Sequence, residues 1–242
     1  DLITMYWEFD DGVNLIGYLG IPGDSSIQTI MEPLGEYQSG LIGEGEAGSY
    51  LVPGFEGEWL GSLQFIKPTS GYWLVLNVPE PPDTVVGYTL ETYPTDPNTM
   101  YHLHELWNLI SYVGPNNSPL DDALPDDIEQ NIQSLIGQDQ AATRLDGEWV
   151  GSLREWRNLK GYWAHVVIDD DQTTPDSIHF SFVNDGLTRS TYTESISESS
   201  ELLPEEFDYV QSMQQSFYFF DDIQVDGEDI QLGDWLLAYN NS

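Results

Sequence analysis

The spacing of apolar residues predicts a chain of short strands with one helix in each half. Two extended segments with aromatic residues, Tyr6 to Phe9 and Tyr101 to Leu106, are typical of strands. Later in each half, short apolar segments bounded by glycine predict further strands, ending with Trp73 to Asn77 and Trp163 to Ile168. This pattern favours a small mixed sheet with a helix packed on it in each half.

The helices are predicted between the early and the late strands. In the first half Ser25 or Ser26 can cap the helix, and apolar residues recur at i, i+3, i+4 and i+7. These residues are Ile27, Ile30, Met31 and Leu34. In the second half Pro125 and the two aspartates after it form a start signal. The apolar stripe there consists of Ile128, Ile132, Leu135 and Ile136, of which the last two also belong to a block that fits a strand.

Four blocks of sequence occur twice in the same order. They are NLIGY and NLISY (14–18 and 108–112), LIG (41–43 and 135–137), GEWLGSL and GEWVGSL (57–63 and 147–153), and GYW (71–73 and 161–163). The copies are 94 residues apart for the first two blocks and 90 apart for the last two, which places a four-residue deletion in a loop between Gly48 and Glu56. No shared block has a nucleophile with its base or a set of metal ligands. The pattern therefore indicates a duplicated scaffold.

The predicted fold class is β-rich α+β, with two tandem repeated modules followed by a partial β-sandwich unit. The expected boundaries are 1–82 for module 1, 83–97 for a proline-rich spacer around the strand-like Val85 to Leu90, 98–173 for module 2, 174–205 for a connecting strand (Ile178 to Val183) with a Ser/Glu linker (Ser195 to Glu201), and 206–242 for the last unit.

The last unit has strand patterns at Ser216 to Phe220 and at Trp235 to Tyr239, with a turn expected at Asp226-Gly227. So few strands do not make an independent sheet. We therefore expect either a truncated chain or a strand that is supplied from elsewhere.

The charge of the chain is strongly one-sided, since 42 acidic residues against six Lys and Arg give a formal net charge of −36. Salt or bound cations must screen self-repulsion of this size, which favours brine, sea water or a calcium-rich surface. Nucleic acid and anionic membranes are disfavoured as partners, because their phosphates need clustered Lys and Arg. No apolar run is long enough to span a membrane, and the absence of cysteine excludes disulfides and thiolate sites.

The blocks LIGEGEA, GEWLGSL, PTSGYW and WNLIS resemble a repeated module of large secreted surface proteins of marine bacteria, which are commonly exported by the type IX secretion system. The segment FDYVQSMQQSFYFFDDIQVDGEDIQLGDWLLAYNN looks like the β-sandwich unit that often follows these modules. The resemblance implies an extracellular or cell-surface location and a modular architecture. It implies no catalytic role.

Calcium is the metal that the acidic clusters favour, because Ca²⁺ prefers oxygen ligands from loops. The main candidates are Asp221, Asp222, Asp226, Glu228 and Asp229. Asp10-Asp11-Gly12 and Asp169 to Asp171 are similar clusters, and none of the three has EF-hand spacing. The alternative is that the acidic loops only solvate the protein.

The histidines offer a second, weaker metal hypothesis. On a strand, His102 and His104 would point to the same face and could hold two corners of a zinc site, while Glu105 would point the opposite way. His165 and His179 have no predicted place. Solvated strand histidines are the alternative.

Four tryptophans in the repeated blocks have two possible roles. Trp59, Trp149, Trp73 and Trp163 can be core residues, or they can be platforms on which a sugar ring stacks. The chain lacks the Gly-x-Ser-x-Gly elbow, a phosphate loop and a dinucleotide fingerprint.

These observations favour a non-catalytic structural or adhesive protein at the cell surface, such as a sheath or filament subunit. Copies of the chain, or other surface proteins, would be joined by strand addition through the open last unit or through the strand at Met5 to Phe9. The alternative is a carbohydrate-binding module of a larger secreted protein. A hydrolase with paired carboxylates is a weaker alternative, because pairs arise by chance among so many acidic residues.

Overall fold

The computed structural model describes residues 2–9, 12–50, 57–78, 85–96, 98–168 and 177–182, together with the backbone of 224–225 and 228–229. The described part of the chain is β-rich with few helices. The chain forms two compact units, Asp1–Leu187 and Thr188–Ser242. Within the first unit, residues 2–96 are called the first half and residues 98–182 the second half. No helix of the described residues is long and apolar enough to cross a membrane.

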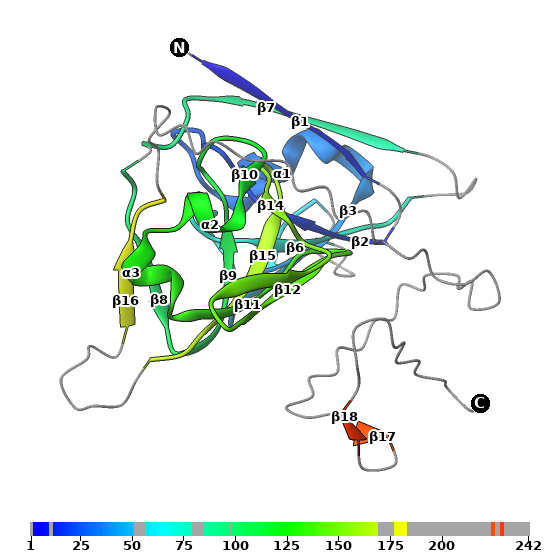
Figure 1. Ribbon diagram of the computed structural model, residues 1–242. Helices are drawn as coiled ribbons and strands as arrows, with labels where there is room; N and C mark the ends of the chain where they lie inside the picture. Colours follow the sequence, from blue (N-terminus) through cyan, green and yellow to red (C-terminus); the bar gives the residue numbers. More distant parts are fainter. Residues whose placement is uncertain are drawn as a thin grey trace. The chain divides into compact units, whose positions relative to one another are not determined.

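The described residues of the first half form a five-stranded antiparallel sheet and a two-stranded ribbon (Figure 1). In spatial order the sheet strands are β2 (Gly12–Ile16), β6 (Tyr72–Leu76), β3 (Gln38–Ile42), β4 (Ala47–Ser49) and β5 (Leu60–Gly61). The ribbon pairs β1 (Ile3–Phe9) with β7 (Val86–Thr92) along their full lengths. Helix α1 (Ile27–Met31) and the 3₁₀ helix η1 (Glu32–Tyr37) connect β2 to β3.

The second half has a sheet of the same strand order in its described residues. Its strands are β9 (Leu106–Ser111), β15 (Gly161–Val166), β11 (Ile132–Ile136), β12 (Ala141–Leu145) and β13 (Glu148–Gly151). A ribbon again accompanies the sheet, formed by β8 (Tyr101–His104) and β16 (Ser177–Phe180). The remaining elements are β10 (Ser118–Pro119), β14 (Glu155–Trp156), α2 (Leu120–Ala123) and α3 (Asp126–Glu129).

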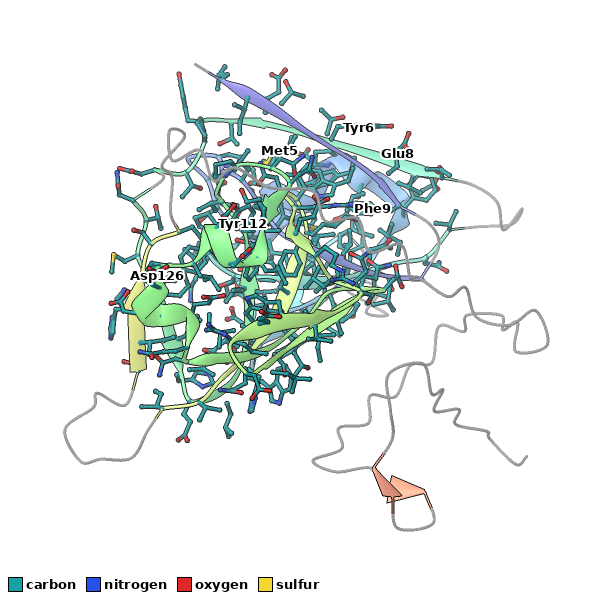
Figure 2. The ribbon with its side chains drawn as sticks, viewed as in Figure 1. Met5, Tyr6, Glu8, Phe9, Tyr112 and Asp126 are labelled. Carbon is teal, nitrogen blue, oxygen red and sulfur yellow. The ribbon has the colours of Figure 1, made fainter. Side chains whose placement is uncertain are left out.

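Each half has its own core, and the ribbon contributes one face to it. In β1 burial alternates, so that Met5, Trp7 and Phe9 enter the first core while Tyr6 and Glu8 point away from it (Figure 2). The indole of Trp7 stacks on Tyr88 of β7 at 4.8 Å between ring centroids. This alternation is what a ribbon with one solvated face requires.

The first predicted helix is confirmed, although it is short. The side chain of Ser26 caps α1 by accepting a hydrogen bond from the amide of Thr29 at 3.4 Å. The buried residues of α1 are Ile27, Ile30 and Met31. Leu34 lies in η1 and packs in the same core.

The second predicted helix is wrong beyond Glu129. Helix α3 ends there, and Ile132, Leu135 and Ile136 belong to β11. This strand lies between β12 and β15 and pairs with both, so it satisfies its backbone groups on two sides. The apolar stripe fits both helical and strand spacing. Pairing with β12 and β15 makes it a strand, and the spacing within this segment does not reveal those partners.

The predicted spacer and connecting segment both contribute strands to the cores. Residues 83–97 contain β7, which alternates buried and exposed residues opposite β1. Residues 174–205 contain β16, which pairs with β8. The predicted spacer and connecting segment thus each supply a ribbon strand that pairs with a strand of the adjoining half, while the module boundaries stay a prediction.

In the second unit, β17 (Gln224–Val225) and β18 (Glu228–Asp229) pair antiparallel on either side of the Asp226-Gly227 dipeptide. That register agrees with the hairpin that the sequence predicts. The predicted strands Ser216 to Phe220 and Trp235 to Tyr239, and the linker Ser195 to Glu201, lie outside the described residues.

Candidate functional site

The two halves are joined by reciprocal backbone contacts. The amide of Gly17 donates to the carbonyl of Leu159 at 3.2 Å, and the amide of Ser111 donates to the carbonyl of Thr69 at 3.1 Å. Position 111 is the counterpart of 17 at the offset of 94, and 69 is the counterpart of 159 at the offset of 90. The bridges Ile16 to Lys160 and Ser70 to Ile110 follow the same rule. We call these contacts the join; their reciprocity is that of an isologous two-fold interface.

The glycine of each GYW block lies in the join, where no side chain fits. A Cβ atom on Gly71 would be 2.6 Å from the carbonyl oxygen of Ile110. A Cβ atom on Gly161 would be 2.7 Å from the carbonyl oxygen of Ile16. Neither glycine has a positive φ, so close approach of the backbones is the reason for glycine here.

A polar side chain from the turn after each LIG block completes the join. The carboxylate of Glu44 accepts a hydrogen bond from the amide of Leu109 at 2.7 Å. In the reciprocal position the amide oxygen of Gln138 accepts from the amide of Leu15 at 2.9 Å. Both leucines are buried, so each side chain satisfies a backbone donor that the join removes from water.

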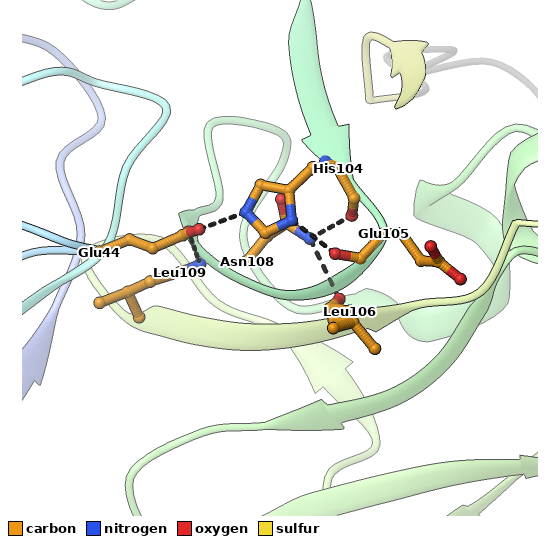
Figure 3. A network of polar contacts seen from close by, with 6 residues as sticks. All are labelled: Glu44, His104, Glu105, Leu106, Asn108 and Leu109. Atoms are coloured by element: carbon orange, nitrogen blue, oxygen red, sulfur yellow. Dashed lines mark hydrogen bonds and ion pairs between the residues drawn. The ribbon is translucent and has the colours of Figure 1, made fainter. Parts of the chain in front are cut away.

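Glu44 and Asn108 both form hydrogen bonds with His104 on one side of the join (Figure 3). The side chain of Asn108 accepts from the amide of His104 at 3.0 Å and donates to the carbonyls of His104 and Leu106 at 2.8 and 3.2 Å. These bonds hold the corner between β8 and β9, where Leu106 has the unfavourable φ of 75°. The asparagine of the NLI block is thus a structural brace.

The imidazole of His104 is held between two acceptors. Its Nδ1 lies 2.6 Å from the carbonyl oxygen of Glu105, and its Nε2 lies 2.5 Å from the carboxylate of Glu44. The hydrogen bond to Glu105, and after it the carboxylate of Glu44, raise the pKa of His104. The arrangement suits the doubly protonated ring, which donates from both nitrogens.

The sequence predicted that His102 and His104 could share a metal site, but the structure directs the two side chains to different partners. His104 turns to Glu44, whereas His102 lies directly opposite His179 in the β8–β16 ribbon. His165 lies on β15, with its ring 4.7 Å from that of Trp107. Among the described residues no group of three or more His, Asp or Glu residues is placed to hold a metal ion.

The four tryptophans have different surroundings. Trp59 is 8% exposed in the first core and donates from its indole nitrogen to Gln38 at 2.9 Å, so the core interpretation holds for it. Trp149 packs against the second core and donates to Glu129 at 2.7 Å. Trp73 and Trp163 are half-buried on the sheet faces opposite to the ribbons. Trp149, Trp73 and Trp163 each keep part of an indole surface available for a ligand, whereas Trp59 is buried.

The predicted calcium ligands fall mostly outside the described residues. This holds for Asp221, Asp222 and Asp226, and for the clusters at 10–11 and 169–171. Glu228 and Asp229 form β18, of which the backbone alone is described. Calcium binding therefore stays a prediction.

A shallow cavity of about 290 Å³ adjoins the join on the side of Gln138. Its walls include Arg157, Lys160 and Tyr162. Arg157 is paired with Glu155 at 2.8 Å, and the amide of Arg157 donates to the hydroxyl of Tyr162. Of the basic residues in the cavity wall, Arg157 is thus engaged in contacts with neighbouring residues of the chain.

Sequence reasoning missed the join and the contacts of Glu44 and Gln138. The offsets of 94 and 90 already placed these residues at corresponding positions. They gave no sign that the two halves contact each other, because matching sequence blocks do not specify how the segments that carry them pack. No family model, no curated protein and no solved structure matches this chain.

Proposed function

We propose that the chain is a non-catalytic structural or adhesive part of an extracellular or cell-surface protein, and that its two halves are copies of one module. The observation that carries the proposal is the use of the repeated residues. Gly71 and Gly161 permit the close contact of the join, and Asn108 braces a corner. Trp59 fills a core. The residues of the repeated blocks thus serve to build each module and to join the two modules.

The ribbon of β1 and β7 supplies an edge for strand addition. Each of these strands has seven residues, and among the described residues each has one strand neighbour, the other. Met5 to Phe9, proposed above as an intermolecular edge, is therefore paired on one side within the chain. An edge with unpaired backbone groups is a template for another strand. We propose that a second copy, or another surface protein, pairs along it.

Self-assembly is tested by negative-stain electron microscopy of the chain at matched concentration in high salt, with millimolar calcium and with chelator. Ordered fibres or sheets would support the structural role, and their loss in chelator would place calcium in the contact. Uniform single particles under all three conditions would discard the polymer. A panel of polysaccharide and peptide substrates serves as the test for turnover, which would contradict the non-catalytic proposal.

Glycan binding is the second candidate, and the position of Trp73 favours it. Its neighbours on the same sheet face include Val13 and Ile42, which are 41% and 46% exposed. Trp163 has Trp107 on the same face one strand away. A flat apolar surface with an indole is the kind of platform on which a pyranose ring stacks.

The glycan proposal is tested on an array with Trp73→Ala and Trp163→Ala. Loss of binding with unchanged circular dichroism would support it. Tyr93→Ala is the matched control, because Tyr93 is 67% exposed and lies beyond the end of β7, outside the sheet. Equal loss in the control would show that binding does not use the sheet faces.

A further inference from the structure

The β8–β16 ribbon brings two histidines into direct opposition on its exposed face. His102 and His179 are register partners, and both side chains point away from the second core. Their ring centroids are 4.4 Å apart with an interplanar angle of 87°. The two Nδ1 atoms are 2.5 Å apart. Two nitrogens at this distance cannot both carry a proton, so at least one lone pair is directed at the other ring.

A third residue fixes the orientation of one ring. The hydroxyl oxygen of Ser177 lies 2.9 Å from Nε2 of His179. In the tautomer with the proton on Nε2, Ser177 accepts that hydrogen bond and Nδ1 keeps its lone pair. A hydrogen-bond partner on the non-ligating nitrogen is what metal-binding histidines have in general, because it sets the tautomer and the ring direction.

The surroundings favour a cation. Neither β8 nor β16 contains a Lys or Arg residue, and the whole chain has a formal net charge of −36. A negative field of this kind raises the local concentration of cations. Neutral imidazole selects Zn²⁺, Cu²⁺ or Ni²⁺, whereas Ca²⁺ prefers oxygen ligands.

We propose that His102 and His179 bind one borderline transition-metal dication, such as Zn²⁺ or Cu²⁺, through their Nδ1 atoms, with water completing the coordination. Two nitrogens at about 2.0 Å from an ion are about 3 Å apart, so the rings open by less than ~1 Å on binding. The ion links β8 to β16 and stabilises the ribbon that closes the second core.

The proposal differs from the zinc hypothesis based on His102 and His104. The second ligand comes from a strand some 77 residues further along the chain, which sequence spacing does not reveal. It also differs from the proposed calcium site, since the ligands are nitrogens and the acidic residues of the last unit are not involved.

The test is isothermal titration of the full chain with Zn²⁺ and, separately, with Cu²⁺, in 0.5 M salt with millimolar Ca²⁺ present to occupy weak carboxylate sites. We expect one site per chain. His102→Gln and His179→Gln should each weaken Kd by at least about tenfold, since one of two protein ligands is lost. His165→Gln is the matched control, because this histidine lies on β15, and it should leave Kd unchanged.

Imidazole ¹⁵N spectra of the wild-type chain give a measurement that does not depend on a variant folding. Zn²⁺ should shift the Nδ1 signals of His102 and His179 and leave that of His165 in place. Binding of equal strength in both ligand variants, shifts at other histidines only, or no site under these conditions would overturn the proposal.

Discussion

Replacing Gly71 by alanine tests whether the join is part of the fold. The new Cβ would be 2.6 Å from the carbonyl oxygen of Ile110 and 3.1 Å from Cδ1 of Leu109, whereas ordinary contact begins at 3.4 Å. The neighbouring backbone must move by about 0.8 Å, since a carbonyl cannot turn aside as a flexible side chain can. Overpacking of this kind costs about 1–3 kcal/mol.

The same movement weakens a hydrogen bond across the join. The amide of Gly71 donates to the carbonyl of Leu109 at 3.0 Å, and such a bond contributes about 1 kcal/mol. We therefore expect Gly71→Ala to lower the free energy of unfolding by ~2–4 kcal/mol. Urea unfolding followed by tryptophan fluorescence measures this loss.

Gly23→Ala is the matched control for this experiment. A Cβ on Gly23 meets nothing within 4 Å, and Gly23 has no positive φ, so the change should stay within ~0.5 kcal/mol. Gly161→Ala should behave like Gly71→Ala, because its contact is reciprocal. A Gly71→Ala chain as stable as the Gly23→Ala chain would refute the reasoning.

Substitutions at three further positions, Glu44, Asp24 and Trp59, test other contacts of the first half. Glu44→Gln should lower the free energy of unfolding by less than ~1 kcal/mol, because the side chain of Gln138 accepts the corresponding hydrogen bond in the other half. Glu44→Ala should lower it by ~1–3 kcal/mol, because the buried amide of Leu109 is left unpaired. Urea unfolding of the two variants compares these losses. The carboxylate of Asp24 accepts a hydrogen bond from the amide of Ser26 and a second one from Thr29, and these lower its pKa in the folded protein. Asp24 therefore stabilises the fold at any pH above its pKa in the unfolded chain. This stabilisation is lost as the pH falls through the lower pKa of Asp24 in the folded protein. Asp24→Asn should therefore reduce stability at pH 7, with the difference from wild type shrinking below about pH 4 in a series of urea titrations. Trp59→Ala should cost ~3–5 kcal/mol by thermal unfolding, and a loss under 1 kcal/mol would contradict its place in the core.

The strands and the first helix were predictable because local signals and tertiary contacts agree there. Ser26 with Ile27, Ile30 and Met31 has a cap and an apolar stripe, and both are used. In the second half, Ile132 continues an apolar stripe that also suits a strand, and pairing of β11 with two neighbours decides the outcome. Spacing within one segment does not contain that information.

The contacts between distant segments were not predictable in the same way. The sequence shows that Gly71 and Gly161 are repeated, but the reason is a carbonyl of the other half. His102 and His179 are 77 residues apart and meet only because β16 pairs with β8. The strand-like segment around Val86 was recognised, whereas its role in the first core depends on its partner β1. Pairing partners, rather than element types, are what local patterns leave open.

Backbone amide exchange at the join most directly tests the claim that the repeated blocks hold the two halves in one unit. The amides of Gly17, Gly71 and Ser111 donate across the join, as do those of Leu15 and Leu109 to Gln138 and Glu44. We predict that these amides exchange as slowly as that of Leu74 in the inner strand β6, because they open only when the unit unfolds. Rapid exchange at these amides, with Leu74 still protected, would show that the halves are not docked in solution and would contradict the account.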